Sequence, residues 1–189
     1  MKITNIDVGG SAQAAILLAR KGQFLPSDPH YVSLPVLYHI VFHSLGSRIY
    51  KIREKTGLFY GAMGMLGNNA TVNHPGMDLI GTKVEPTDVQ RALQELHNLL
   101  TKLGSNPEIT HEELTAAKSW YEHKIVETLM SPELFAGLIV QYKHLYPGHN
   151  YRDLLMNHVD QINKLTIDEV NTLAKNVFKA PYDLTIVAR

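Results

Sequence analysis

The stretch Ser47-Arg-Ile-Tyr-Lys-Ile-Arg-Glu-Lys-Thr-Gly-Leu-Phe-Tyr60 predicts a short basic helix, a glycine stop and the start of a β-strand. Ser47 is a favourable N-cap residue, and Gly57 is of the residue type that most often follows the end of a helix. This arrangement places Arg53 near the end of the helix and Tyr60 at the start of the strand. Two side chains able to bind a peptide could therefore meet across one turn.

Arg53 and Tyr60 have two interpretations that their residue types leave open. In the first, Arg53 is a solvated arginine and Tyr60 lies on a half-buried strand, and spacing alone favours this interpretation. In the second, the guanidinium group and the phenol both donate hydrogen bonds to peptide carbonyls. Together they would hold an extended substrate or the oxygen of a tetrahedral intermediate.

The composition is that of one ordinary globular domain. The chain has 189 residues, of which 44% are hydrophobic and 19% charged, so we expect a single domain over residues 1–189. Eighteen basic residues balance eighteen acidic ones, which argues against nucleic acid as a partner. We find no apolar run long enough to span a bilayer and no signal peptide, so we expect a soluble protein of the cytoplasm or periplasm with no membrane partner. Cysteine is absent, which excludes disulfides and a cysteine nucleophile.

The strands and helices predicted on either side of residues 47–60 follow an order that indicates an α+β fold. A buried strand is predicted at residues 12–20, a helix at 30–43 and a β-hairpin from 59–70 and 77–84. Helices follow at 89–103, 110–129, from 132, at 151–161 and at 166–178, before a last strand at 184–188. This order favours an antiparallel or mixed sheet with the helices packed on one face.

Local signals mark where several helices begin and end. Gly104 is expected to end the helix before it, as the C′ residue. Capping boxes are predicted at three helix starts, namely Thr87-x-x-Gln90, Thr110-x-x-Glu113 and Thr166-x-x-Glu169.

The ten histidines form no recognisable zinc motif. His39 and His43 are spaced i, i+4 and would share one helix face, where they could hold a metal ion. In the zinc motif His-x-x-Glu-His a glutamate base precedes the second histidine, and here that residue is Phe42. The motif His-Glu-x-x-His is also missing, because His111-Glu112 has no second histidine at the required position. We therefore expect no metal, cofactor or catalytic residue in this chain, and interpret the two histidines as residues at the edge of a packed helix.

Residues 47–49 and 53–60 resemble the signature of a known family. The signature is Ser-Arg-Leu … Arg-Glu-Lys-x-Gly-Leu-x-Tyr, found in the pitrilysin/insulinase-type zinc metallopeptidases, including mitochondrial processing peptidases and bacterial zinc proteases. Residues 12–20, 28–31, 109–118 and 162–170 are also similar to segments of this family. One departure is local: the family usually has a glycine pair before Ser-Arg-Leu, and this chain has Phe-His-Ser-Leu at residues 42–45.

The resemblance implies a non-catalytic role in peptide hydrolysis. In that family two related α+β halves face each other across a chamber, and His-x-x-Glu-His lies in the first half. The signature found here belongs to the later, C-terminal, non-zinc half, so the implied fold is that of a metallopeptidase half (LuxS/processing-peptidase-like). Arg53 and Tyr60 match the pair that helps bind substrate there. The chain is then a fragment of a longer two-half peptidase, inactive alone, with zinc expected in the missing half.

The resemblance also implies the partners, while two other classes of function stay open. The implied partners are a zinc-bearing half or subunit and a peptide substrate, and the isolated fragment could form a homodimer. One alternative is a structural or assembly domain related to the core subunits of respiratory complexes, without peptidase activity. The other is a small metalloenzyme that uses His39 and His43. A His-x-x-Glu-His motif upstream in the native reading frame would favour the peptidase over the assembly domain.

Overall fold

The strand β2 (Ala14–Lys21) shows how the sheet meets its helices. In this computed structural model, which describes residues 3–188, buried side chains alternate along β2 with more exposed ones. Ile16 and Leu18 are buried in the core, whereas Leu17 points to the opposite, open face of the sheet. Alternation of this kind is typical of a strand with one covered face. The strand predicted as buried at residues 12–20 is therefore buried on one face only.

The sheet has five strands in the order β1-β5-β2-β4-β3. Strand β1 pairs with β5 in parallel, and the remaining pairs are antiparallel, so the predicted mixed sheet is confirmed. The chain order is β1 (Ile3–Ile6), β2, η1 (Tyr31–Ser33), α1 (Leu34–Tyr38), η2 (His39–His43), α2 (Arg48–Thr56), β3 (Phe59–Asn68), β4 (Met77–Val84), η3 (Pro86–Asp88), α3 (Val89–Ser105), α4 (His111–Met130), α5 (Pro132–Leu145), α6 (Tyr151–Lys164), α7 (Ile167–Lys179) and β5 (Leu184–Ala188).

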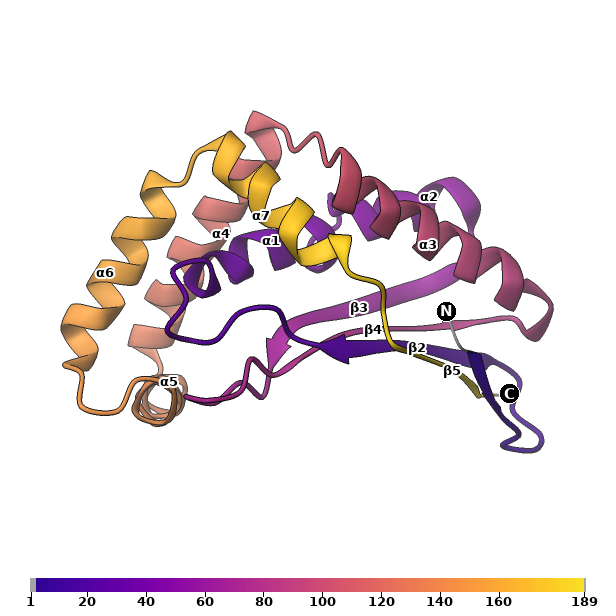
Figure 1. The fold of residues 1–189 in the computed structure, drawn as a ribbon, viewed down its shortest axis with the longest axis horizontal. Helices are drawn as coiled ribbons and strands as arrows, with labels where there is room; N and C mark the ends of the chain where they lie inside the picture. Colours follow the sequence, from indigo (N-terminus) through magenta and orange to yellow (C-terminus); the bar gives the residue numbers. More distant parts are fainter. Residues whose placement is uncertain (1–2, 189) are drawn as a thin grey trace.

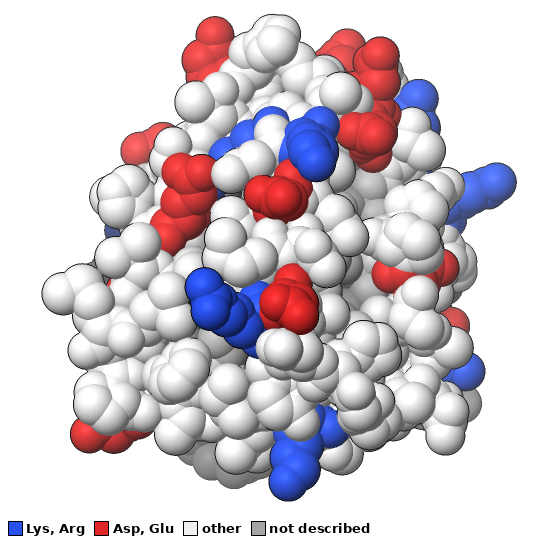
Figure 2. Space-filling model, turned by 90° about the vertical axis from the view of Figure 1, so that its left-hand side faces the viewer, with Lys and Arg blue, Asp and Glu red and all other residues white. Residues whose placement is uncertain are grey.

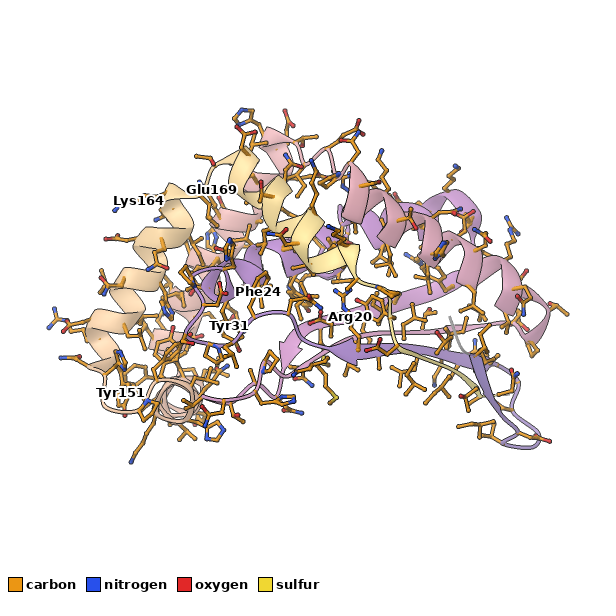
Figure 3. All side chains as sticks on the ribbon, in the orientation of Figure 1. Arg20, Phe24, Tyr31, Tyr151, Lys164 and Glu169 are labelled. Atoms are coloured by element: carbon orange, nitrogen blue, oxygen red, sulfur yellow. The ribbon has the colours of Figure 1, made fainter. Side chains whose placement is uncertain are left out.

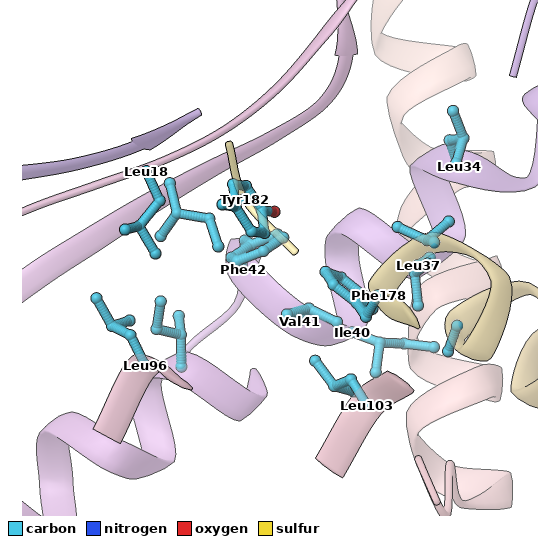
Figure 4. Packing of buried hydrophobic residues seen from close by; sticks show 14 of the residues in the cluster. Leu18, Leu34, Leu37, Ile40, Val41, Phe42, Leu96, Leu103, Phe178 and Tyr182 are labelled. Carbon is cyan, nitrogen blue, oxygen red and sulfur yellow. The ribbon is translucent and has the colours of Figure 1, made fainter. Parts of the chain in front are cut away.

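Helices α1, α2, α3 and α7 lie over one face of the sheet, as Figure 1 shows. The core fills the space between these helices and the sheet. Figure 4 shows Leu18 from β2, Phe42 from η2 and Phe178 from α7 converging there. Helices α4, α5 and α6 form a second group at one end of the molecule (Figure 1). None of the helices described in residues 3–188 combines the length and the apolarity needed to cross a membrane.

A buried ion pair joins the end of α7 to the sheet. Arg20 of β2 donates from Nε to Oδ2 of Asp78 on β4 at 3.0 Å, and only 4% and 2% of these residues is exposed. The Arg20 guanidinium also donates to the main-chain oxygens of Val177 and Ala180. Asp78 Oδ1 accepts from the Gly67 N–H of β3 at 2.9 Å. Arg20 lies where β2 passes beneath the end of α7 (Figure 3), so one charge pair connects three strands and a helix.

Three local predictions differ from the structure, and one strand was not predicted. The segment 30–43 is not one α-helix but a 3₁₀ turn, an α-helical turn and a π-helical turn in succession. Strand β1 was not predicted, and its residues are all exposed. Gly104 does not end α3, because the helix continues to Ser105. A Cβ on Gly104 would lie 2.6 Å from the Phe178 carbonyl oxygen, so close packing against α7 requires glycine at this position. The capping box at Thr87 does not form, because a 3₁₀ turn precedes α3 and Asp88 becomes its N-cap.

Candidate functional site

Helix α2 begins and ends as its residues predict. The Ser47 side chain accepts a hydrogen bond from the Tyr50 N–H at 3.4 Å, and Ser47 is 1% exposed. At the other end, Gly57 has a φ of 66°, which is left-handed backbone that favours glycine. Its N–H donates to the Arg53 carbonyl at 2.8 Å. Both ends of α2 are therefore defined, and Arg53 lies in its last turn.

A half-buried ion pair ties α2 to the start of α4. Arg48 donates from Nε and Nη2 to the two carboxylate oxygens of Glu113, at 2.7 and 2.6 Å. Glu113 is also the N3 residue of the Thr110 capping box, which forms as predicted. Lys51 lies 3.3 Å from the same carboxylate. Nothing in the sequence links Arg48 with Glu113, because they are 65 positions apart, so this anchor of the candidate site was missed.

Arg53 is half-buried rather than fully solvated. Its guanidinium carbon lies 4.8 Å from the centre of the Tyr50 ring, one turn earlier on α2. Stacking of this kind restricts the guanidinium plane and leaves its rim of N–H donors in one orientation. Arg53 also lines a cavity of about 510 Å³ together with residues of the α2–β3 turn and the segment after β4. Acidic and basic side chains both line this cavity.

Tyr60 lies in β3, and its side chain lies outside the described part of the structure. The pairing of β3 with β4 shifts register between Phe59 and Ala62, so Tyr60 falls within a β-bulge. Bulges re-aim side chains and occur often beside active sites. The Gly61 carbonyl in this bulge accepts from the Thr82 hydroxyl at 2.8 Å. Whether the phenol of Tyr60 meets the guanidinium of Arg53 stays a prediction.

His39 and His43 do not form a metal site with the residues around them. Their ring centres are 5.6 Å apart, and both rings pack against Trp120 of α4, at 5.0 and 4.8 Å. Burial, and secondly the neighbouring His43, lower the pKa of His39. Phe42, where the zinc motif has its base, is buried in the core. Within residues 3–188 no three His, Asp or Glu side chains are grouped as a metal site.

A second polar cluster is buried between α4, α5 and α6. The hydroxyl of Tyr142 lies 3.1 Å from Nδ1 of His158, and these residues are 7% and 8% exposed. Burial lowers the pKa of His158 to about 4, so its imidazole is neutral at pH 7. Burial also raises the pKa of the nearby Tyr121 to about 12. These groups are uncharged at neutral pH and hold the three helices together.

One comparison with known proteins shows a family. A family profile described as the inactive domain of M16 peptidases matches residues 2–120. A comparison of the sequence with curated proteins gives no match.

Three solved structures with the same fold are longer than this chain. A protease from Helicobacter pylori is 19% identical, with a TM-score of 0.84 over 99% of this chain and 44% of its own. An M16 inactive domain from Pseudomonas fluorescens is 21% identical, with a TM-score of 0.80 over 98% and 43%. A conserved protein from Enterococcus faecalis is 17% identical, with a TM-score of 0.80 over 100% and 42%. The chain therefore spans less than half the length of these three proteins.

Proposed function

Because the chain belongs to the family of M16 peptidase inactive domains, we propose that it is the non-catalytic, substrate-binding half of a zinc peptidase. In this role it binds an extended peptide and positions it opposite a zinc site that another domain or subunit carries. Arg53 and Tyr60 donate hydrogen bonds to the peptide, and the zinc chemistry belongs to the other half.

The placement of Arg53 is the observation that best supports this role. The side chain is half-buried, lies over the Tyr50 ring and lines a cavity at the start of β3. Helix α2, which carries it, is capped at both ends and tied to α4 through Arg48 and Glu113. A donor held by a rigid element loses less conformational entropy on binding than a mobile one. Arg53 is thus suited to hold a peptide carbonyl in a fixed position.

The charges around Arg53 indicate what kind of peptide fits. Three carboxylates line its cavity, those of Glu54, Glu85 and Asp88, against the two cations of Arg53 and Lys83. The excess of negative charge disfavours acidic peptides and favours neutral or basic ones. In such a peptide the group left for Arg53 to bind is a main-chain carbonyl oxygen. The substrate class that we propose is therefore an extended peptide with neutral or basic side chains.

Calorimetric titration of the chain with two capped peptides tests this proposal. One peptide alternates alanine with lysine and the other alternates alanine with glutamate, at equal length. We expect the basic peptide to bind more tightly than the acidic one, and Arg53→Ala to weaken its binding by about tenfold or more, as loss of a charge-assisted hydrogen bond does. Arg91→Ala, at an exposed position of α3, is the matched control and should leave binding unchanged.

Two results would contradict the proposal. Equal binding by Arg53→Ala and the unchanged chain would remove Arg53 from the site, and no binding of either peptide would favour an assembly domain. Cleavage of peptides by the isolated chain with one bound zinc per molecule would show that this half is itself catalytic.

A further inference from the structure

One face of the sheet has no helix packed on it. Helices α1, α2, α3 and α7 cover the face to which Ile16 and Leu18 point, and no helix of residues 3–188 lies over the opposite, open face (Figure 1). Leu17, Met63 and Leu184 lie on the open face, on three different strands, and are 37%, 63% and 40% exposed. Apolar side chains gathered on an exposed surface mark an interaction site.

Gly81 leaves a notch in the middle of the open face. A Cβ added to Gly81 would lie 3.6 Å from Met63 Cγ and 3.9 Å from Leu17 Cδ1, so these two side chains flank a position that has none. The charged residues that β2 and β4 contribute to this face are Lys21 and Lys83, which lie at opposite ends of the paired strands. The open face therefore has an apolar centre and a charged rim, as protein interfaces do.

Helix α5 is a second apolar surface without a partner. Phe135, Ile139 and Val140 form an uncharged stripe along it, in which Phe135 and Val140 are 41% and 68% exposed. Only Tyr142 and Leu145 of this helix are buried. Figure 2, which faces the end of the molecule with α5 and α6, shows broad areas without acidic or basic side chains between scattered charges. A helix that is apolar on all sides is normally covered on all sides.

The chain exposes more surface than a compact monomer of its mass does. Its accessible surface is 10624 Å², whereas a folded monomer of 21.2 kDa exposes about 9,100 Å². The excess is about 1,500 Å² for each chain. Two copies that buried this excess against each other would bury about 3,000 Å² together, which is in the range of permanent homodimers.

We propose that two copies of the chain associate about a twofold axis, with α5 of each copy packed across the open face of the other. The stripe that contains Phe135 and Val140 then lies over the Gly81 notch, between Leu17 and Met63 of the partner copy. A twofold dimer makes every contact twice, so both apolar surfaces of both copies are covered at once. Any other single partner would need an apolar helix and an apolar sheet of its own. This inference does not rest on the proposed function.

Sedimentation velocity over a range of chain concentrations tests the proposal. The unchanged chain should sediment as a dimer, at twice the 21.2 kDa of one copy. Met63→Lys on the open face and Val140→Glu on α5 should each raise the dimer dissociation constant at least tenfold, because each places an unpaired charge in both contacts. Leu45→Glu is the matched control, because Leu45 is 75% exposed between η2 and α2, and it should leave the constant within twofold. All three side chains are exposed, so the far-ultraviolet circular dichroism should stay unchanged.

A mixture of the two variants tests whether the helix of one copy meets the sheet of the other. The Met63→Lys copy keeps an unchanged α5 and the Val140→Glu copy keeps an unchanged open face, so a mixed dimer has one intact contact and one with opposite charges. The mixture should form dimers at concentrations at which each variant alone is monomeric. A monomeric unchanged chain, a dimer that only one variant weakens, or a mixture no more associated than its components would overturn the proposal. Arg53→Ala should dimerise like the unchanged chain, so failure here and failure of the Arg53 site are distinguishable.

Discussion

The buried pair of Arg20 and Asp78 should be among the most sensitive sites in the chain. We consider Arg20→Met, Asp78→Asn and the double variant. In the unchanged chain the guanidinium carbon of Arg20 lies 5.8 and 4.5 Å from the centres of the Phe178 and Tyr182 rings. Methionine keeps much of the apolar part of the arginine side chain. Asparagine keeps the shape of Asp78 and an oxygen that can still accept from Gly67. The single variants therefore change charge more than volume.

The expected cost follows from what each variant leaves behind. Arg20→Met leaves a carboxylate that is 2% exposed and still accepts a hydrogen bond from the Gly67 N–H, while Asp78→Asn leaves a buried guanidinium without its counter-charge. Removal of one partner of a buried pair typically costs about 3–5 kcal/mol. Removal of both leaves no buried charge, so the double variant should cost about 3–4 kcal/mol, no more than one single variant and well below the sum of the two, about 6–10 kcal/mol. The coupling free energy should exceed about 2 kcal/mol.

Urea unfolding, followed by far-ultraviolet circular dichroism and by Trp120 fluorescence, measures these free energies. A domain of this size is typically stable by about 5–15 kcal/mol, so the single variants should retain a measurable transition. Additive costs, within about 0.5 kcal/mol, would refute the view that the two charges act as one unit. Single-variant costs below about 1 kcal/mol would refute it as well.

Three further predictions concern His158, Glu113 and Gly57. The pKa of His158 is about 4 in the folded chain and ordinarily about 6.5, so unfolding takes up a proton between these two pH values. The free energy of unfolding should therefore fall as the pH drops below 6.5, by about 2 kcal/mol at pH 5. Urea titrations at pH 7 and pH 5 should show a smaller fall for His158→Gln. Parallel curves for the two proteins would contradict this. Glu113→Gln should cost about 2 kcal/mol of unfolding free energy by loss of its bidentate bond to Arg48, whereas Glu127→Gln, in an exposed pair with Lys124, should cost less than about 0.5 kcal/mol. Gly57→Ala should lower the unfolding free energy by about 1 kcal/mol, because the backbone of Gly57 has a left-handed φ. Gly46→Ala is the control and should have a smaller effect, because Gly46 has no such φ and an added Cβ would meet only the Ser44 side chain. Equal effects of the two substitutions would reject the backbone explanation.

Local signals predicted local structure well. The N-cap Ser47, the C-cap Gly57 and the capping boxes at Thr110 and Thr166 all form, because each involves groups within four residues of one another. Interactions between distant segments were invisible in the sequence. Arg20, the last residue of the strand predicted at 12–20, is one of the most buried charged residues, since its partners come from β4 and the end of α7.

In the candidate site, too, local features were predictable and contacts between distant segments were not. The position of Arg53 at the end of α2 was predictable from the helix signals, but its anchor through Arg48 and Glu113 was not. Gly104 was mistaken for a helix end because the reason for it, the nearby Phe178 carbonyl, lies on another helix.

Peptide turnover by a reconstituted pair tests the proposed role most directly. The chain is combined with a zinc-bearing M16 half that requires it for activity, and hydrolysis of a basic peptide is measured with the unchanged chain, Arg53→Ala and Arg91→Ala. If Arg53 positions the peptide, its loss should lower kcat/KM by about tenfold to a hundredfold, as expected for a charge-assisted hydrogen bond, while Arg91→Ala leaves kcat/KM unchanged. Equal kcat/KM values for all three would contradict the assignment of this chain's Arg53 to substrate binding.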